Sequence, residues 1–252
     1  MKKVTLFCFM LVFVSILFCQ QTYSAGIDPE DIVGIWPLED DVKGGEVIDL
    51  SENGFTGIIK GGEQEDGKVG QCLDFAKGDT VEISLGKGTI TDNVTVVMWL
   101  RFTDLTDQQN YYSIYDQSDH RYVPYKTSAN ELHFWSNNWD IPSGAFVKKD
   151  EWHHVANVYD GSTVSIYVDG ELGNSQAGAG FALADQQQTS WLATDAGGWI
   201  SACTIDDVGL FNVALDAETI KNIMDNGVER ATGFAAVETD GKLPSLWGKL
   251  KI

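Results

Sequence analysis

The sequence predicts an all-β fold, a two-sheet antiparallel β-sandwich of the jelly-roll type with one short helix near the C-terminus. Segments in which every second residue is apolar recur along the chain, as expected for strands with one face in a core. Glycine, aspartate and asparagine separate these segments at short intervals, and only one segment has a helical apolar period.

The clearest strands are Asn93–Phe102 and Thr163–Val168, in which alternate residues are apolar. Asp169 and Gly170 follow the second of these strands and have the positive-φ chemistry of a tight turn. Further strands are predicted at Ile32–Glu39, Thr56–Lys60, Gln71–Phe75, Thr80–Leu85, Tyr111–Asp116, Arg121–Lys126, Glu131–Trp135, Trp152–Tyr159, Thr189–Thr194 and Cys203–Phe211.

The single helix is predicted after Asp216, which suits the N-cap position. Ile220, Ile223 and Met224 form an apolar stripe at helical spacing, and Gly227 ends the segment.

The first 25 residues have the layout of a secretory signal peptide. Two lysines precede an apolar run from Val4 to Cys19, and a cleavage point is expected after Ser24 or Ala25. The run is about 16 residues long, shorter than the roughly 20 that a membrane-spanning helix needs. We therefore expect a secreted, extracellular or periplasmic protein; a membrane anchor and a lipoprotein attached through Cys19 are the alternatives.

Removal of residues 1–25 leaves one sandwich-sized domain, residues 26–227, and a C-terminal tail, residues 228–252. The tail could dock on the sandwich through Trp247. The chain has 17 Lys and Arg against 37 Asp and Glu, a net charge of −20. Such a surface repels nucleic acid, which we therefore exclude as a partner, and anionic membranes, and it suits divalent cations. No stretch after the signal peptide is long and apolar enough to span a membrane.

Two cysteines remain after the signal peptide, Cys72 and Cys203. In an oxidising compartment such a pair indicates one disulfide bond, and two buried free thiols are the alternative.

Five stretches in order resemble the bacterial laminin-G-like domains of the concanavalin A-like lectin/glucanase superfamily, from about Val33 to Gly227. They are "VGIWPLEDDVKGGEVIDLSENGFTGIIKGG", "QCLDFAKGDTVEIS", "NVTVVMWLRF", "EWHHVANVYDGSTVSIYVDGEL" and "IDDVGLFNVALDAETIKNIMDNG". The resemblance implies a jelly roll with one concave face. The family includes sugar-binding modules, adhesion modules and accessory domains of enzymes, so the resemblance predicts the fold more closely than the function.

The adjacent histidines of "WHHVANVY" face opposite sides of a strand, so they cannot readily chelate one metal ion. His154 continues the apolar face, and we expect it to be a packed, hydrogen-bonded core residue rather than a catalytic one. His153 should point outward, toward the concave face.

Glycoside hydrolases that share this fold resemble one another in a strand of the type E-x-D-x-x-E, whose alternate carboxylates point into the cleft. The sequence has no such run, and it has no G-x-S-x-G, phosphate-loop or C-x-x-C motif. We therefore expect no catalytic residues and no enzymatic activity.

The resemblance implies a structural calcium ion between an N-terminal loop and an acidic residue of the last core strand. The matching positions are Asp49, Asn53 and Asp206. Calcium takes six to eight oxygen ligands, and "DLSENGFTG" is rich in them. An Asx-turn with a hydrogen-bonded carboxylate is the alternative.

Aromatic rings stack on sugar rings, while amides and carboxylates bind hydroxyls. Two segments combine these groups near expected loops, "WSNNWD" and "TDAGGWI". A lid over the core is the alternative role for a loop tryptophan. The predicted ligand-binding residues are Trp135, Asn137, Asn138, Trp139, Asp195 and Trp199.

These features predict a secreted, non-catalytic module that binds an extracellular carbohydrate or glycoconjugate, such as a surface glycoprotein. The alternatives are a structural or protein-adhesion module and a cryptic glycoside hydrolase.

Overall fold

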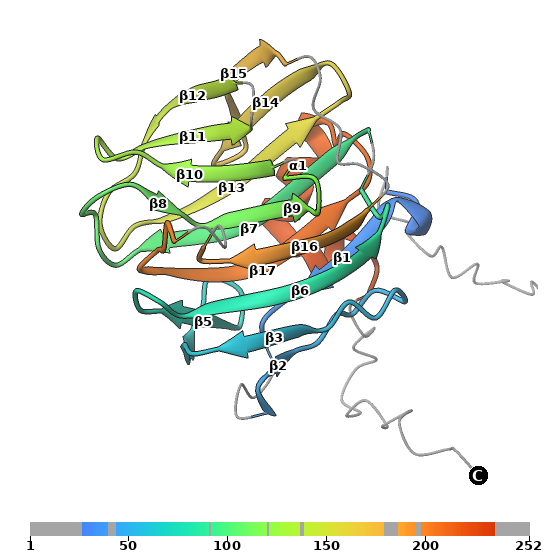
Figure 1. The fold of residues 1–252 in the computed structure, drawn as a ribbon, viewed down its shortest axis with the longest axis horizontal. Helices are drawn as coiled ribbons and strands as arrows, with labels where there is room; N and C mark the ends of the chain where they lie inside the picture. The colour runs from blue at the N-terminus through green and yellow to red at the C-terminus, as the bar shows by residue number, and fades with distance from the viewer. Residues whose placement is uncertain are drawn as a thin grey trace, which may run out of the picture.

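The computed structural model describes residues 27–39, 44–90, 92–119, 121–136, 139–178, 186–194 and 198–234. Within them the chain forms two antiparallel sheets packed face to face (Figure 1), which confirms the predicted sandwich. The expected signal peptide, residues 1–25, and Trp247 lie outside the described residues. No described helix is long and apolar enough to cross a membrane.

The first sheet has helices against its outer face, and we call it the covered sheet. Its short strand β1 (Ile32–Trp36) pairs with β17 beside the main order of strands. That order is β15 (Glu171–Ala177), β14 (Thr163–Val168), β13 (Trp152–Tyr159), β7 (Val94–Phe102), β17 (Cys203–Phe211), β5 (Gln71–Phe75) and β4 (Glu63–Asp66).

The second sheet has no helix against its outer face among the described residues, and we call it the open sheet. Its short strand β8 (Gln109–Asn110) pairs with β10 beside the main order. That order is β12 (Trp139–Phe146), β11 (Glu131–Ser136), β10 (Arg121–Lys126), β9 (Tyr112–Asp116), β16 (Gln187–Leu192), β6 (Thr80–Lys87), β3 (Gly57–Lys60) and β2 (Glu46–Val47).

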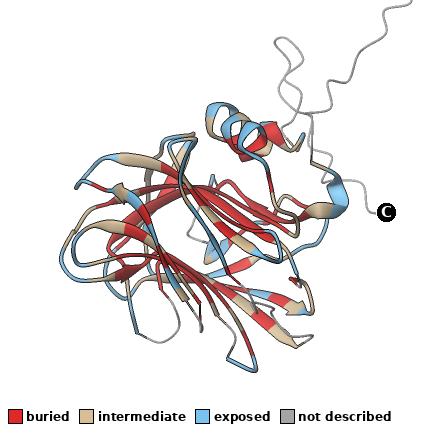
Figure 2. Ribbon diagram, turned by 90° about the horizontal axis from the view of Figure 1, so that it is seen from above, coloured by how far each residue is buried: buried red, intermediate tan, exposed pale blue. Residues whose placement is uncertain are grey.

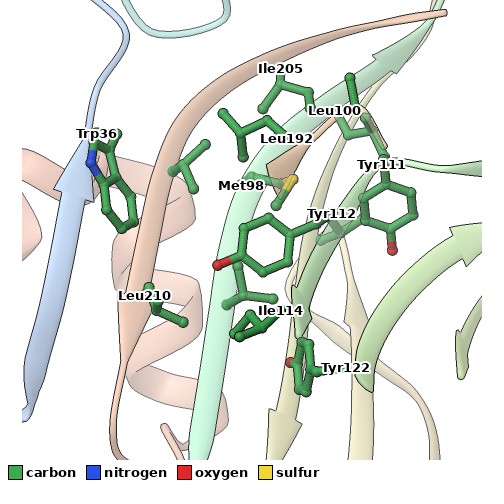
Figure 3. Close-up of a cluster of buried hydrophobic side chains, with 14 of the residues drawn as sticks. Trp36, Met98, Leu100, Tyr111, Tyr112, Ile114, Tyr122, Leu192, Ile205 and Leu210 are labelled. Atoms are coloured by element: carbon green, nitrogen blue, oxygen red, sulfur yellow. The ribbon is translucent and has the colours of Figure 1, made fainter. Parts of the chain in front are cut away.

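The main hydrophobic core lies between the two sheets (Figures 2 and 3). Alternate residues of β7 enter it, beginning with Val94 and ending with Phe102, as the period-two pattern predicts. The residues drawn around the centre of this core include Trp36, Met98, Leu100, Tyr111, Tyr112, Ile114, Tyr122, Leu192, Ile205 and Leu210.

A second hydrophobic cluster fixes helix α1 (Ala217–Asn226) against the outer face of the covered sheet. The helix begins as predicted, because the carboxylate of Asp216 accepts a hydrogen bond from the backbone N–H of Thr219 at 2.8 Å. Gly227 ends it with a φ of 82°. The short helix α2 (Val228–Ala231) packs into the same cluster, so the packed part of the chain continues past Gly227. A 3₁₀ turn, Pro29–Asp31, precedes β1.

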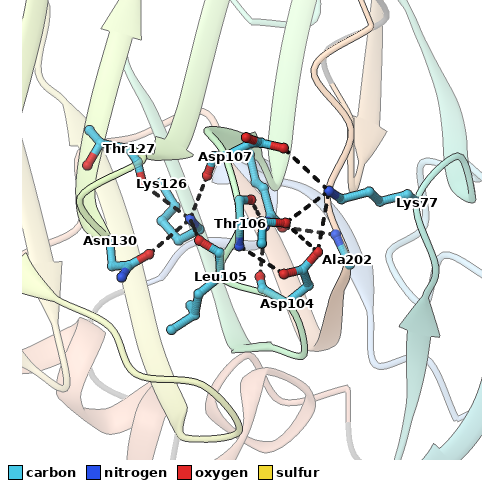
Figure 4. A network of polar contacts seen from close by, with 10 residues as sticks. Lys77, Asp104, Leu105, Thr106, Asp107, Lys126, Thr127, Asn130 and Ala202 are labelled. Carbon is cyan, nitrogen blue, oxygen red and sulfur yellow. Dashed lines mark hydrogen bonds and ion pairs between the residues drawn. The ribbon is translucent and has the colours of Figure 1, made fainter.

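Lys126 anchors the loop that follows β7 at one end of the sandwich (Figure 4). The three N–H groups on its Nζ are shared among four acceptors, the carbonyl oxygens of Leu105 at 3.1 Å, Asp107 at 2.8 Å and Thr127 at 3.1 Å, and Oδ1 of Asn130 at 3.2 Å. Burial lowers the pKa of this fully buried amine. The four acceptors compensate for its desolvation and hold the loop that leads directly into β8.

Candidate functional site

A pocket of about 320 Å³ lies on the outer face of the open sheet. It is built from β8, β10, β11 and β12 together with the turn before β17. The residues that line it are Gln108, Asn110, Arg121, Val123, Tyr125, Trp135, Asp140 and Trp199.

Strand register explains why these side chains meet. Along β10, residues Arg121, Val123 and Tyr125 face outward, and Tyr122 between them enters the core. Trp135 of β11 pairs with Val123 on one side and with Asp140 of β12 on the other. In a sheet, paired residues project on the same face, so one row of side chains crosses three strands into the pocket.

Two tryptophan rings provide the apolar surface of the pocket. Trp199 is 50% exposed and follows Gly198, whose φ of 105° suits glycine. The guanidinium of Arg121 lies 4.7 Å from the ring centre of Tyr115 and 6.0 Å from that of Trp135. These cation–π contacts hold the arginine over the two rings, where it lines the pocket.

The carboxylate of Asp140 is held by two neighbours. The hydroxyl of Tyr125 donates to both of its oxygens at 2.9 Å, and Nδ1 of His133 lies 2.9 Å from its Oδ1. Nε2 of the same histidine lies 3.3 Å from Oε2 of Glu131. Burial raises the pKa of Tyr125, and the hydrogen bond to Asp140 raises it further. This phenol therefore stays protonated and remains a donor.

Of the six predicted ligand-binding residues, the structure brings Trp135 and Trp199 together in this pocket. Asn137, Asn138 and Asp195 lie outside the described residues.

Trp139 corrects the expectation from the sequence, because it lies on the core face of β12. Its ring stacks on Phe134 with centroids 5.6 Å apart and lies 6.1 Å from the ring of Tyr159. Asp140 pairs with Trp135 on the outer face, so the preceding residue must point inward.

The sequence prediction missed Asn110, Arg121 and Tyr125. The period-two pattern of Arg121–Lys126 places Arg121 and Tyr125 on one face, but it does not show which other strand lies beside them. Asn110 lies opposite Tyr125 because β8 pairs with β10, and this pairing is known only from the structure.

His154 is packed, as expected, but it lacks the hydrogen bond that we expected. It is almost fully buried on the outer face of the covered sheet, with its ring 5.2 Å from that of Trp99 in a T-shaped contact. Neither of its ring nitrogens has a hydrogen-bond partner among the described residues. Burial lowers the pKa of His154 to about 4, so it is neutral at physiological pH. His153 does not point outward as expected, because it shares its face of β13 with the core residue Val155. Its Nδ1 lies 2.9 Å from Oδ2 of Asp169, and it does not line the pocket.

The loop residues predicted to bind calcium form a hydrogen-bonded turn. Oδ1 of Asp49 accepts from the backbone N–H groups of Ile35 and Ser51, and its Oδ2 accepts from the Ser51 hydroxyl and the Phe55 N–H. Nδ2 of Asn53 donates to backbone carbonyls of β1. These contacts match the Asx-turn alternative.

Asp206 does not join this turn. Ile35, to which Asp49 is bonded, pairs with Gly209, and a β-bulge of β17 lies between Gly209 and Asp206. Asp49 and Asn53 are bonded within the turn and to β1, whereas Asp206 is bonded to the N–H groups of Lys68 and Val69, and calcium binding by this set stays a prediction. Among the described residues no group of three or more His, Cys, Asp or Glu side chains is arranged to hold a metal ion.

Asp206 is instead part of a buried acidic pair with Asp207. Its Oδ2 accepts from the N–H groups of Lys68 and Val69 at 2.7 and 2.8 Å, and its Oδ1 has no partner among the described residues. Burial raises the pKa of both carboxyls to about 7, and the charge of Glu39 raises it further in each case.

The predicted disulfide bond is absent from the structure, in which Cys72 and Cys203 are buried free thiols. Cys203 pairs with Phe75 and faces the core, whereas Cys72 adjoins the core residue Leu73 and so faces the opposite side of the sheet. Three residues of strand separate them along the chain direction, about 10 Å, which exceeds the reach of a disulfide.

Comparison with known proteins agrees with this architecture. Residues 75–221, more than half of the chain, match a laminin-G family model described as the concanavalin A-like lectin/glucanases superfamily. No curated protein matches the chain.

Solved structures with the same fold come from several sources. Domain 4 of AbnA, a GH43 extracellular arabinanase from Geobacillus stearothermophilus solved with arabinotriose, has a TM-score of 0.64 and 16% identity and covers 77% of this chain and 98% of its own. The binding domain of Paraclostridial Mosquitocidal Protein 1 has a TM-score of 0.61 and 12% identity, covering 79% of this chain and 53% of its own. Trypanosoma rangeli sialidase has a TM-score of 0.59 and 14% identity, covering 77% of this chain and 32% of its own. At these identities the likeness shows the fold.

Proposed function

The chain belongs to the concanavalin A-like lectin/glucanase superfamily, and we propose that it is a non-catalytic module that binds extracellular carbohydrate in the pocket of its open sheet. The observation that carries this proposal is the convergence of Trp135 and Trp199 with amide and carboxylate groups in one pocket. Small-molecule sites combine apolar and aromatic walls with a few placed polar groups, and aromatic faces suit the apolar faces of sugar rings.

The polar lining supports binding rather than hydrolysis. Asp140 is the one carboxylate among the described lining residues. Glycoside hydrolases place two carboxyl groups on either side of the bond they cleave, about 5 to 9.5 Å apart. The nearby Glu131 is paired with His133 rather than lining the pocket.

Laminin-G-like domains are typically extracellular, and one of the similar structures is a domain of an extracellular arabinanase that was solved with an oligosaccharide. Both facts support export of this chain after removal of residues 1–25. An exported module of this kind would hold a polysaccharide or a surface glycoconjugate outside the cell.

The proposal is tested by binding of the purified protein to a glycan array and to soluble arabinan, xylan and β-glucan. Trp135→Ala and Trp199→Ala should each weaken binding about tenfold or more, since each removes a stacking surface worth a kilocalorie or more. Phe146→Ala is the matched control, because Phe146 is 61% exposed and does not line the pocket. Folded protein that binds no glycan, or hydrolysis of any of these polymers, would contradict the proposal.

Protein adhesion is the second candidate, and a separate surface favours it. Phe146 and Leu172 are 61% and 52% exposed on β12 and β15, two strands that meet where the sheets join. Exposed apolar residues on neighbouring strands can mark a protein interface. Adhesion predicts that Phe146→Ala and Leu172→Ala abolish attachment to protein-coated surfaces, whereas the two tryptophan variants leave it unchanged.

A further inference from the structure

The pocket carries an amide oxygen that lacks a donor. Asn110 is only 3% exposed, lines the pocket, and its Oδ1 has no hydrogen-bond partner among the described residues. A buried acceptor without a donor is destabilising, and such groups are rare in folded proteins. A ligand hydroxyl would supply the missing donor, so this atom indicates which chemistry the pocket accepts.

A second acceptor lies close by in Asp140, whose carboxylate is 48% exposed. Tyr125 and His133 both contact its Oδ1, and Tyr125 also donates to Oδ2. A carboxylate has about four lone-pair positions, so these contacts fix its orientation and leave capacity toward the pocket. Its negative charge makes it a strong acceptor for hydroxyl groups.

The one cation among the described lining residues is already engaged. Arg121 pairs with Asp119 at 2.6 Å and lies over the ring of Tyr115. An anionic sugar would therefore be repelled by the Asp140 carboxylate, and the guanidinium in the pocket that could attract it already pairs with Asp119. The net charge of the chain, −20, adds a long-range repulsion of the same sign.

From this arrangement, and resting on the proposed carbohydrate binding, we infer that the pocket selects neutral sugars that donate hydroxyl hydrogen bonds and excludes uronic, sialic and sulfated sugars. Asn110 and Asp140 are the acceptors that determine this specificity. Tyr125 and His133 are positioning residues, which act by holding the carboxylate of Asp140 toward the ligand.

The test compares charged and uncharged forms of the same polymers by isothermal titration calorimetry. Polygalacturonate, glucuronoxylan and alginate are used as such and after chemical reduction of their carboxyl groups to hydroxymethyl groups, beside neutral arabinan, xylan and β-glucan. The expected result is binding to one or more neutral or reduced polymers at least tenfold tighter than to any unreduced acidic polymer. Acidic polymers that bind as tightly as their reduced forms would overturn the inference and leave the proposed function standing. Folded protein that binds none of the polymers would refute the proposed function as well.

Two variants separate the pocket from the overall charge. Asp140→Asn should lower the preference for neutral polymer about tenfold, because it removes the local charge and adds an amide donor. Asp225→Asn removes the same charge from the exposed face of α1, and the preference should not change. Equal effects of the two substitutions would overturn the role of Asp140.

Asn110→Ala tests the second acceptor. It should weaken the affinity for neutral polymer about fivefold to tenfold, and unchanged affinity would overturn the role of Asn110.

The positioning role is tested by a double-mutant cycle. Tyr125→Phe removes the hydroxyl and keeps the ring, and it should weaken neutral binding severalfold in the wild-type background. In the Asp140→Asn background it should cause a clearly smaller loss, since the group that it positions has changed. Additive losses would show that Tyr125 acts separately from Asp140.

Discussion

The outer faces of the two sheets differ in what lies against them. On the covered sheet, every residue of β1 and β17 is buried, because helix α1 and its neighbours pack on the face that the core leaves free. On the open sheet, β11 and β16 alternate strictly between buried and partly buried residues. Both faces carry buried polar atoms without partners, Oδ1 of Asp206 on the first and Oδ1 of Asn110 on the second, but only Asn110 lines the pocket.

The outer faces of the two sheets therefore have different roles, one in stability and one in binding. A polar atom sealed under a helix or a loop affects stability, because solvent and ligands do not reach it. Oδ1 of Asn110 is also buried, but this residue lines the pocket, so a ligand bound there can supply the partner and the atom affects binding. The molecule should therefore respond to substitution in opposite ways on its two outer faces.

The largest expected effect is on stability at the covered face. Ile223 of α1 is fully buried in the second cluster, and Ile223→Ala should lower the free energy of unfolding by about 2–5 kcal/mol. Glycan affinity of the remaining folded protein should not change. Urea unfolding monitored by tryptophan fluorescence measures the first quantity. Leu172→Ala removes a similar side chain that is 52% exposed, and its cost should be below about 0.5 kcal/mol. Equal costs for the two variants would mean that the helix contributes little to the fold.

The second effect checks the assignment of Trp139 to the core. Trp139→Ala removes a ring that stacks on Phe134, and we expect a loss of about 2–3 kcal/mol, less than for a fully buried tryptophan because the site is partly exposed. Trp135→Ala, four residues earlier and in the pocket, should lose about 1 kcal/mol or less. Thermal unfolding of both variants gives the comparison. The reverse order of melting temperatures would place the wrong tryptophan in the pocket.

The third effect is the pH dependence of the covered face. The carboxyls of Asp206 and Asp207 have pKa values of about 7 in the folded protein, above the usual value near 3.9 of an unfolded chain, so folding favours their protonated forms. Their contribution to stability is fully present below about pH 4 and is lost as the pH rises to 7. His154 acts in the opposite direction: its pKa of about 4 means that its contribution is lost as the pH falls from about 6.5 to 4.

Asp206→Asn isolates one of these groups, because its amide oxygen can still accept from the N–H groups of Lys68 and Val69. We compare the free energy of unfolding of the variant with that of the wild type at each pH. The difference, variant minus wild type, should be roughly 2 kcal/mol larger at pH 8 than at pH 4. Denaturant unfolding at both values measures this difference. Asp225→Asn changes an exposed carboxylate and should show no such dependence. A stability difference between Asp206→Asn and the wild type that is the same at both pH values would contradict the assigned pKa shift.

The strands that the sequence pattern located most closely are those with an alternating apolar face. The bounds of β5, β10, β13 and β17 agree with the predicted segments to the residue. The prediction missed the two-residue strands β2 and β8 and three longer ones, β4, β12 and β15. The sequences of these three longer strands, EQED, WDIPSGAF and ELGNSQA, lack a regular apolar alternation. The longer three are each an end strand of their own sheet, where one side has no strand paired within that sheet and proline and glycine are tolerated.

The site was predictable only in part for a related reason. Composition and loop chemistry pointed to Trp135 and Trp199, since both belong to segments rich in aromatic and polar residues. Asn110 enters the pocket because β8 pairs with β10, and such register between segments cannot be inferred from the pattern within either one. The cysteines show the same limit, because their number indicates a disulfide and only the register places them on opposite faces.

The smallest expected effect on stability comes from the edge of the pocket. Arg121 is an exposed-face residue whose cation–π contact with Tyr115 and ion pair with Asp119 are both near solvent, where each contributes about 1 kcal/mol or less. Arg121→Lys keeps the charge but loses the planar group that lies over the ring. Because both contacts are near solvent, the free energy of unfolding should change by less than about 1 kcal/mol. Binding of neutral glycan should nevertheless fall severalfold, because the flat guanidinium forms part of the pocket wall. Calorimetric titration and thermal unfolding on the same sample measure both quantities. A large loss of stability with intact binding would show that Arg121 has a structural role. The proposed difference between the two sheets, stability on the covered face and binding on the open face, would then be wrong.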